Sequence, residues 1–379
     1  MPMDERNDMN KFRKKRKRSK LAVRGVIFLV VMVIVILIAA NWKTLIAPFK
    51  DVALNPGEGG FPVALPGSTG YVMGELGENF YLLTDTYLYT YNAVGAELSS
   101  FQHGFQNPAS NSNDRRTLVF DKNGLDLKVF SRTSELFSKT MDDSIVFAQI
   151  GTMERSAVVT TSSRYSNYLY IFNGEGKQIF RWASPDEKIM QVCFGPNDNS
   201  FFVTVVGESG GDLRTNVVKF DIENAESETW RTYLGSDISF SLERCDDGVY
   251  VVTSGGAYLL DEQTGEISAE TLFSRQVVGV AGTDGVRVIL FHDAGSNGEI
   301  AVAYGEGLEA AAAITPDAVT AFDVCKGNLY ILSGSKLLVY NSMLEAVKVK
   351  DLDDVYSDVK IINNCAYLLG YNKVQRVEF

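Results

Sequence analysis

Short apolar runs separated by polar turn residues cover most of the chain. From about Phe61 onward the runs are rich in Val, Ile, Leu, Tyr and Phe, and Gly, Asn, Asp and Ser interrupt them. Alternation of this kind is typical of β-strands, whereas an amphipathic helix repeats its apolar positions every three to four residues. The pattern therefore predicts an all-β region from residue 61 to residue 379.

One strand-and-turn unit recurs along this region. It reads YLYTYN at residues 87–92, YLYIFN at residues 168–173 and KLLVYN at residues 336–341. In each copy an alternating apolar run ends in an aromatic residue, and a residue suited to a tight turn follows. We call these strand ends and turn residues the repeat signature: Tyr91, Asn92, Phe130, Phe172, Asn173, Phe220, Asp221, Leu260, Asp261, Tyr304, Tyr340 and Asn341.

The spacing of the repeat signature points to one architecture. Successive copies are 36 to 48 residues apart, and a four-stranded propeller blade takes about 40–50 residues. Two further apolar runs precede each signature strand and a more polar run follows it, as expected if the fourth strand is the exposed outer edge of a blade. The sequence predicts a β-propeller with eight blades, and seven blades are the alternative.

The C-terminal residues 373–379 match a third strand, with Phe379 at the aromatic position. A fourth strand is then needed for this blade, because an open strand edge presents unpaired backbone groups. We expect the N-terminal strand 61–66 to pair with the C-terminal blade 357–379 and close the ring. Two segments are less clear: residues 107–113 make a poor first strand, and Ala310–Ala313 fits either a strand or a short helical insert.

On these strand patterns and turn positions, residues 61–379 resemble the quinoprotein-type (PQQ-like) and WD-type (WD40-like) β-propeller repeat superfamily. The resemblance is particularly to the single-span membrane-anchored propeller proteins of Gram-positive bacteria. The chain lacks the regular Gly-His and Trp-Asp dipeptides of WD repeats, and with three Trp in all it lacks the tryptophan motifs of quinoprotein blades. The resemblance therefore implies a fold and carries little about function.

The N-terminal part predicts a membrane anchor. Residues 25–42 contain no charged side chain, and eighteen helical residues span about 27 Å, close to the hydrocarbon thickness of a bilayer. The apolar run is too long for the core of a cleaved signal peptide, and Leu37 lies where a cleavage site needs a small residue. The anchor residues are Gly25, Val26, Ile27, Phe28, Leu29, Val30, Val31, Ile34, Ile36, Leu37 and Trp42.

Charge sets the expected orientation of this anchor. Residues 1–24 hold ten Lys or Arg and three Asp or Glu, whereas the whole chain has a net charge of −11. Basic flanks stay on the cytoplasmic side of a membrane, so we expect a cytoplasmic tail at 1–24, a tether at 43–60 and an extracytoplasmic propeller. A nucleic-acid partner is disfavoured, because the basic run would lie against the membrane.

The sequence offers no catalytic constellation. It contains only His103 and His292, on different expected blades, and no Gly-x-Ser-x-Gly motif. Cys193, Cys245, Cys325 and Cys365 show no metal-ligand spacing, and they read as buried apolar residues, with disulfides as the alternative. We therefore predict no catalytic, metal or cofactor site.

The predicted function is a non-enzymatic scaffold for a protein or peptide partner at the cell envelope. The acidic body would repel anionic wall polymers, which favours protein partners. The alternative is an extracellular enzyme, either glycan-active or quinone-dependent, because propeller enzymes collect their residues from several blades and leave no linear motif.

Overall fold

In the computed structural model the chain divides into two units, Met1–Asn55 and Pro56–Phe379. The structure describes Met32 and residues 59–68, 70–224, 227–283, 286–295 and 298–379. Within these residues no helix is long and apolar enough to cross a membrane. The anchor predicted at 25–42 falls outside the described residues, apart from Met32, as do the tail at 1–24 and nearly all of the tether at 43–60.

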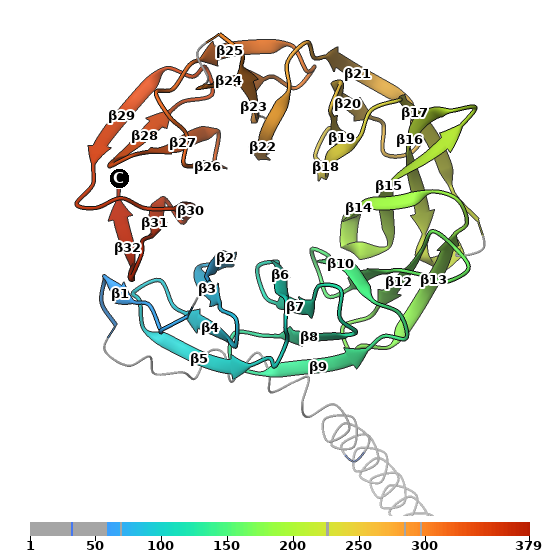
Figure 1. The fold of residues 1–379 in the computed structure, drawn as a ribbon, viewed down its shortest axis with the longest axis horizontal. Coiled ribbons are helices and arrows are strands. Elements are labelled where there is room, and N and C mark those ends of the chain that lie inside the picture. The colour runs from blue at the N-terminus through green and yellow to red at the C-terminus, as the bar shows by residue number, and fades with distance from the viewer. Residues whose placement is uncertain (1–31, 33–58, 69, 225–226, 284–285, 296–297) are drawn as a thin grey trace, which may run out of the picture. The chain divides into compact units, whose positions relative to one another are not determined.

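The described residues of the second unit form eight four-stranded antiparallel sheets arranged as the blades of a ring (Figure 1). This confirms the eight-bladed propeller. The innermost strands lie around the axis and are β2 (Val72–Leu76), β6 (Pro108–Ser112), β10 (Ile145–Ile150), β14 (Lys188–Phe194), β18 (Ser239–Cys245), β22 (Val277–Thr283), β26 (Ala321–Cys325) and β30 (Asp358–Ile362).

The other strands follow outward in chain order. Second strands are β3 (Asn79–Leu83), β7 (Thr117–Asp121), β11 (Ser156–Thr160), β15 (Ser200–Ser209), β19 (Gly248–Thr253), β23 (Val286–Asp293), β27 (Asn328–Ser333) and β31 (Cys365–Leu369). Third strands are β4 (Tyr87–Tyr91), β8 (Asp126–Phe130), β12 (Asn167–Phe172), β16 (Asp212–Asp221), β20 (Gly256–Leu260), β24 (Gly298–Tyr304), β28 (Lys336–Tyr340) and β32 (Lys373–Glu378).

Outer strands complete the blades. They are β5 (Glu97–Gln102), β9 (Glu135–Thr140), β13 (Gln178–Ser184), β17 (Trp230–Gly235), β21 (Ile267–Leu272), β25 (Ala310–Ile314), β29 (Ala346–Asp351) and, in the eighth blade, β1 (Val63–Ala64). Ala310–Ala313 is thus part of a strand, and residues 107–113 contain β6. Two 3₁₀ turns, η1 (Pro196–Asp198) and η2 (Ile222–Asn224), interrupt the fourth blade.

Both ends of the ring meet in the eighth blade. Val63 pairs with Val374 and Ala64 with Lys373, and the Leu65 amide donates to the Asn372 carbonyl at 2.9 Å. Before β1, the Phe61 ring lies 5.8 Å from that of Tyr367 and 6.2 Å from that of Phe80, centroid to centroid. Strand pairing and aromatic packing together therefore join the first blade to the last.

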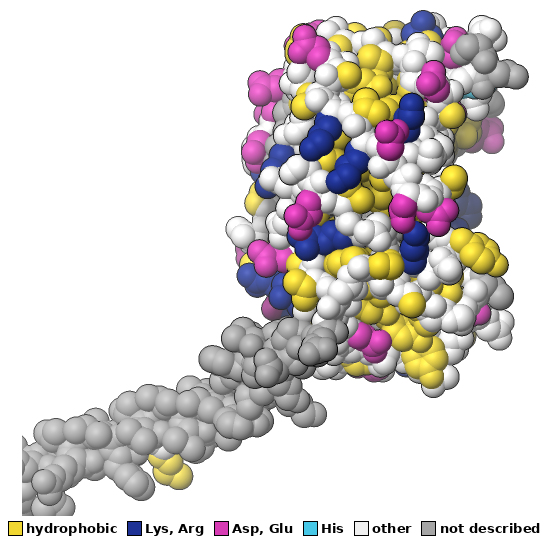
Figure 2. Space-filling model, turned by 90° about the vertical axis from the view of Figure 1, so that its left-hand side faces the viewer, with side chains coloured by type: hydrophobic (Ala, Val, Ile, Leu, Met, Phe, Trp, Pro, Cys, Tyr) yellow, Lys and Arg dark blue, Asp and Glu magenta, His cyan; other side chains and the backbone are white. Residues whose placement is uncertain are grey.

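Burial decreases from the middle of each blade to its outer edge. Every residue of β31 is buried, whereas β29 is almost wholly exposed. On the side of the ring where β29 lies, Figure 2 shows acidic and basic side chains interspersed with apolar ones, and Val347 and Val349 are exposed on that strand. Lys348 and Lys350 alternate with them, and charges on an outer strand oppose edge-to-edge pairing with another chain.

Candidate functional site

The repeat signature stabilises the turn between the third and fourth strands of a blade. The Asn341 side-chain oxygen accepts the amides of Met343 and Glu345 at 3.0 and 2.9 Å. Asn92, Asn173 and Asp261 make equivalent turns with the residues that follow them. The preceding residues are buried between blades: Tyr91, Phe130, Phe172, Phe220, Leu260 and Tyr304. The signature residues therefore hold the third and fourth strands together.

The eighth blade places a different residue at the aromatic position. Tyr340 pairs with Leu329, and the residue in the same register of the last blade is Val377, which pairs with Ala366. Phe379 lies two residues further, beyond the end of β32, and its ring contacts Tyr330 with 5.2 Å between centroids. The seventh blade therefore receives the aromatic ring that we expected inside the eighth.

The ring has two faces, which we name for what they carry. The Asx face holds the turns between first and second strands and the signature turns between third and fourth strands. The crescent face holds the hairpins between second and third strands and the connections from each outer strand to the next innermost strand. Every connection of the topology belongs to one of these two faces.

Four successive innermost strands carry a β-bulge at the same place. In blades three to six the pairing skips one residue near the start of the strand, between Ile145 and Phe147 and at the matching points of the next three blades. The skipped residues are Val146, Met190, Phe240 and Val278, which we call the bulge crescent. A bulge leaves its extra residue out of the ladder and re-aims its side chain, and bulges are enriched at functional sites.

The bulge crescent lies on the innermost strands at the crescent face. All four residues are apolar, and Phe240 and Val278 leave 51% and 55% of their surface exposed. The sequence interpretation missed them. The available signal was an apolar neighbour that breaks strict alternation, as in Ile145-Val146, Ile189-Met190 and Val277-Val278, but such a pair also occurs in strands buried on both sides.

A cavity of about 290 Å³ adjoins the crescent between blades six and seven. Apolar side chains line most of it, and the carboxyl-bearing Glu299 also contributes. Its lining residues are Val278, Leu290, Glu299, Val319, Thr320, Ala321 and Phe322. A mostly apolar pocket with one acidic group suits a side chain that has an apolar body and a positive charge nearby.

Most of the exposed large apolar side chains in connections or at strand ends lie on the crescent face. They are Val72, Leu125, Leu213, Ile238, Phe240, Leu272, Val278, Val355 and Tyr371. The Asx face exposes fewer, namely Val94, Met153, Ile267, Met343 and Phe379. The crescent face thus exposes more large apolar side chains than the Asx face does.

Acidic residues accompany the crescent. The connections that lead into blades three and four carry Asp142, Asp143 and Asp186, and among the described residues no ion pair involves any of them. The connection into blade five carries Asp237, which accepts the Ser254 hydroxyl at 3.1 Å. Arg275 is the basic residue of the connection into blade six. The rim of the crescent is thus mainly negative.

Polar side chains on the innermost strands tie neighbouring blades together. The Asp323 carboxylate of blade seven accepts the Ile361 amide of blade eight at 2.8 Å. Asn111 of blade two occupies the same register and accepts the Ile150 amide of blade three, also at 2.8 Å. Since these groups are engaged with backbone, their first role is structural.

Carboxyl groups near these ties have perturbed acidity. Burial raises the pKa of Glu75, and the nearby carboxyl groups of Asp323 and Asp114 raise it further, while Lys360 opposes them. Burial also raises the pKa of Asp323 and of Asp358. These groups favour the protonated form more than exposed carboxyl groups do.

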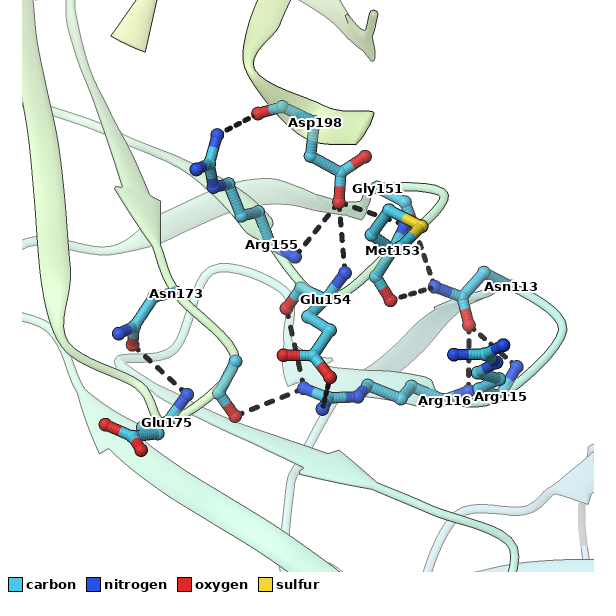
Figure 3. A network of polar contacts seen from close by, with 11 residues as sticks. Asn113, Arg115, Arg116, Gly151, Met153, Glu154, Arg155, Asn173, Glu175 and Asp198 are labelled. Carbon is cyan, nitrogen blue, oxygen red and sulfur yellow. Dashed lines mark hydrogen bonds and ion pairs between the residues drawn. The ribbon is translucent and has the colours of Figure 1, made fainter. Parts of the chain in front are cut away.

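The Asx face is held by a buried acidic residue (Figure 3). The Asp198 carboxylate, in η1 of blade four, accepts four successive amides of the loop 152–155 of blade three at 2.9 to 3.2 Å. Asn113 of blade two donates to the Gly151 carbonyl at 2.6 Å, and Arg116 pairs with Glu154 at 3.0 Å. One network therefore fixes the turns of three blades.

A buried arginine joins blades five and six at the same face. Arg287 on β23 is 1% exposed, and its guanidinium lies 4.8 Å from the ring centroid of Tyr250 and 2.6 Å from the Asp247 carboxylate. The ring face and the carboxylate compensate part of the cost of burying the charge.

The histidines and cysteines have structural environments. His103 follows β5 and is buried, its ring nitrogens bonded to the Thr84 carbonyl and the Phe105 amide, and burial lowers its pKa. His292 lies within β23. All four cysteines are described and free, and burial raises the pKa of the Cys193 thiol to about 12. No cluster of three His, Cys, Asp or Glu suited to a metal occurs in the part of the chain that the structure describes.

Comparison with known proteins gives a family and a fold. Residues 67–379 match the model of a "Family of unknown function (DUF5711)". No curated protein matches the chain.

Solved structures of propellers are similar to the second unit. BamB from Moraxella catarrhalis has a TM-score of 0.56 at 10% identity, covering 83% of this chain and 100% of that one. The C-terminal WD40 domain of Sif2 gives 0.61 at 11% identity, with coverages of 85% and 99%. Apo AztD from Citrobacter koseri gives 0.54 at 9%, with 86% and 94%. Identities this low show a shared propeller fold alone.

Proposed function

The chain belongs to the family of unknown function DUF5711, and on this premise we propose that it is a non-enzymatic scaffold, held to a membrane by residues 25–42, whose propeller binds a protein or peptide partner outside the cytoplasm. The single observation that carries the binding role is the bulge crescent. A closed ring offers a rigid frame, and four blades repeat an apolar residue at one place on that frame. Rigid presentation lowers the entropic cost of binding.

The uncharged run at 25–42 and the basic residues of 1–24 support the membrane part of the proposal. The resemblance of residues 61–379 to single-span propeller proteins of Gram-positive bacteria also supports this part of the proposal. Such a protein would keep its ring within reach of envelope partners.

Protease treatment of intact cells tests the topology. With a tag at each terminus, added protease should remove the C-terminal tag and leave the N-terminal tag intact. A chain lacking residues 25–42 is the control and should leave the membrane fraction. Protection of both tags in intact cells would contradict an extracytoplasmic propeller.

Site-specific photo-crosslinking in the same cells tests the scaffold. A crosslinker at Tyr371, which is 97% exposed on the crescent face, should capture a reproducible partner. A crosslinker at Met343 reports on the Asx face. The absence of any reproducible partner at both positions would refute the scaffold.

A second candidate is an extracellular enzyme that acts on glycans, and the raised pKa of Glu75 favours it. A raised carboxyl pKa is what a general acid in glycoside hydrolysis needs. Turnover of a glycan panel, lost in Glu75→Gln, would support this candidate, and a chromophore in the absorption spectrum of the purified protein would support a quinone enzyme.

A further inference from the structure

The crescent face combines three features that together describe an occupant. It carries the bulge crescent, an apolar cavity that includes one crescent residue, and acidic connections beside the first two bulges. The first two features share Val278, and all three lie on blades three to seven of one face.

We propose that the crescent face binds a cationic segment of a partner protein, with large apolar side chains interspersed between its lysines or arginines. This rests on the scaffold function proposed above and names the chemistry of the partner.

The apolar part of the recognition follows from the bulges. Phe240 and Val278 lie on adjacent innermost strands, β18 and β22, which are in contact. More than half of each side chain remains open to solvent, although the preceding residues Ser239 and Val277 are buried. Covering them with apolar side chains removes this surface from water, which stabilises a complex. The cavity beside Val278 has room for a side chain.

The positive charge of the proposed partner segment follows from the acidic residues beside the bulge crescent. Asp142, Asp143 and Asp186 lie on the connections that lead to Val146 and Met190, with Lys188 at the start of β14, and Glu299 lines the cavity beside Val278. A cationic segment gains from each of these carboxylates, whereas an acidic segment is repelled. Arg275 lies on the connection into blade six, so acidic residues outnumber basic ones on the connections into blades three to six.

Defined peptides test the inference on the full-length chain in detergent. The probe is a labelled peptide that alternates lysine with leucine or phenylalanine, and fluorescence anisotropy gives its Kd. The double variant Phe240→Ser/Val278→Ser should weaken binding about tenfold or more, because central apolar contacts dominate interfaces. The matched control Val94→Ser/Met343→Ser changes two equally exposed apolar residues of the Asx face and should bind as the unchanged chain does.

Charge is tested separately. Replacing the lysines of the probe with glutamate should abolish measurable binding, and Asp142→Asn/Asp143→Asn/Asp186→Asn should weaken the lysine probe and reduce the salt dependence of its Kd. Equal binding of both peptides would overturn the inference.

Hydrogen exchange gives a readout that does not depend on variants. The lysine probe should slow amide exchange at the bulges of β10, β14, β18 and β22 and leave the turns of the Asx face unchanged. Protection on the Asx face alone, an unchanged Kd in the double variant, or self-association that covers the crescent would each overturn the inference. If crosslinking captures a partner through the Asx face, the scaffold function stands and only this inference fails.

Discussion

The two faces of the propeller are built by the same eight blades, but their side chains have different environments. On the Asx face, polar side chains are used up in holding turns: Asp198 binds four amides, and Arg287 is buried against Tyr250 and Asp247. On the crescent face, apolar side chains such as Phe240 and Val278 are exposed and acidic ones such as Asp142 have no ion-pair partner among the described residues. The comparison separates a face whose charged groups hold turns from a face with exposed apolar side chains, where we propose that a partner binds.

Removing Asp198 should break the supporting face most severely. In Asp198→Ala, four amides of the loop 152–155 lose the buried carboxylate that accepts them, and we expect the free energy of unfolding to fall by about 3 kcal/mol. Urea denaturation measures the change. Asp198→Asn keeps one acceptor oxygen and should lose less. Equal stability of Asp198→Ala and the unchanged chain would show that the network is not needed.

Two substitutions of Arg287 separate the effect of losing its charge on stability from the effect of losing its packing. Arg287→Ala leaves a cavity between blades five and six, and we expect a loss of about 2–4 kcal/mol. Arg287→Met refills the volume without burying a charge and should be close to neutral. The two variants, compared by urea denaturation, contradict this account if they are destabilised equally.

Glu75 should give a smaller and pH-dependent effect. Its pKa is raised in the folded state by burial and by Asp323 and Asp114, so the charged form costs stability at neutral pH. That cost disappears as the pH falls through the raised pKa and the carboxyl group takes up a proton. Glu75→Gln should therefore raise the Tm at pH 7 and raise it less at pH 5.

Glu78 is the control for this measurement, because it lies in the turn that follows β2 and not on an innermost strand beside Asp323 and Asp114. Glu78→Gln should change the Tm little at either pH. A Glu75→Gln gain that grows as the pH falls would reverse the sign of the argument.

The smallest change in stability is expected on the crescent face. Phe240→Ser replaces a side chain that is half exposed and outside the ladder, so the free energy of unfolding should change by less than about 1 kcal/mol. A loss as large as that of Asp198→Ala would mean that the crescent is part of the core, and the contrast between the two faces would not hold.

The period of the sequence was sufficient to predict the blades, because the third strands of blades one to seven end in a signature whose physical role is local. Asn341 bonds amides two and four residues ahead, so its function is visible within one turn. The candidate site could not be predicted in the same way. A bulge such as Val278 is a shift in register between two strands, and an apolar pair in sequence does not distinguish it from a buried pair.

Side chains whose partners lie in another blade also could not be predicted from the sequence. Asp198 looks like an ordinary turn residue in Pro196-Asn197-Asp198, yet its partners are in another blade. Arg287 follows Val286 at a position where blade seven has Leu329, and only the fold supplies Tyr250 beside it. The anchor at 25–42 stays a prediction.

The position of β1 has a consequence for how the ring could be released from a surface. A protease that cuts within residues 43–60 would leave Phe61 and Val63 in place, and the freed fragment would keep all eight sheets whole. A cut just after Ala64 would strip the last blade of its outer strand and expose β32. The site of cleavage would thus determine whether an intact propeller is released or whether its eighth blade loses a strand and begins to unfold.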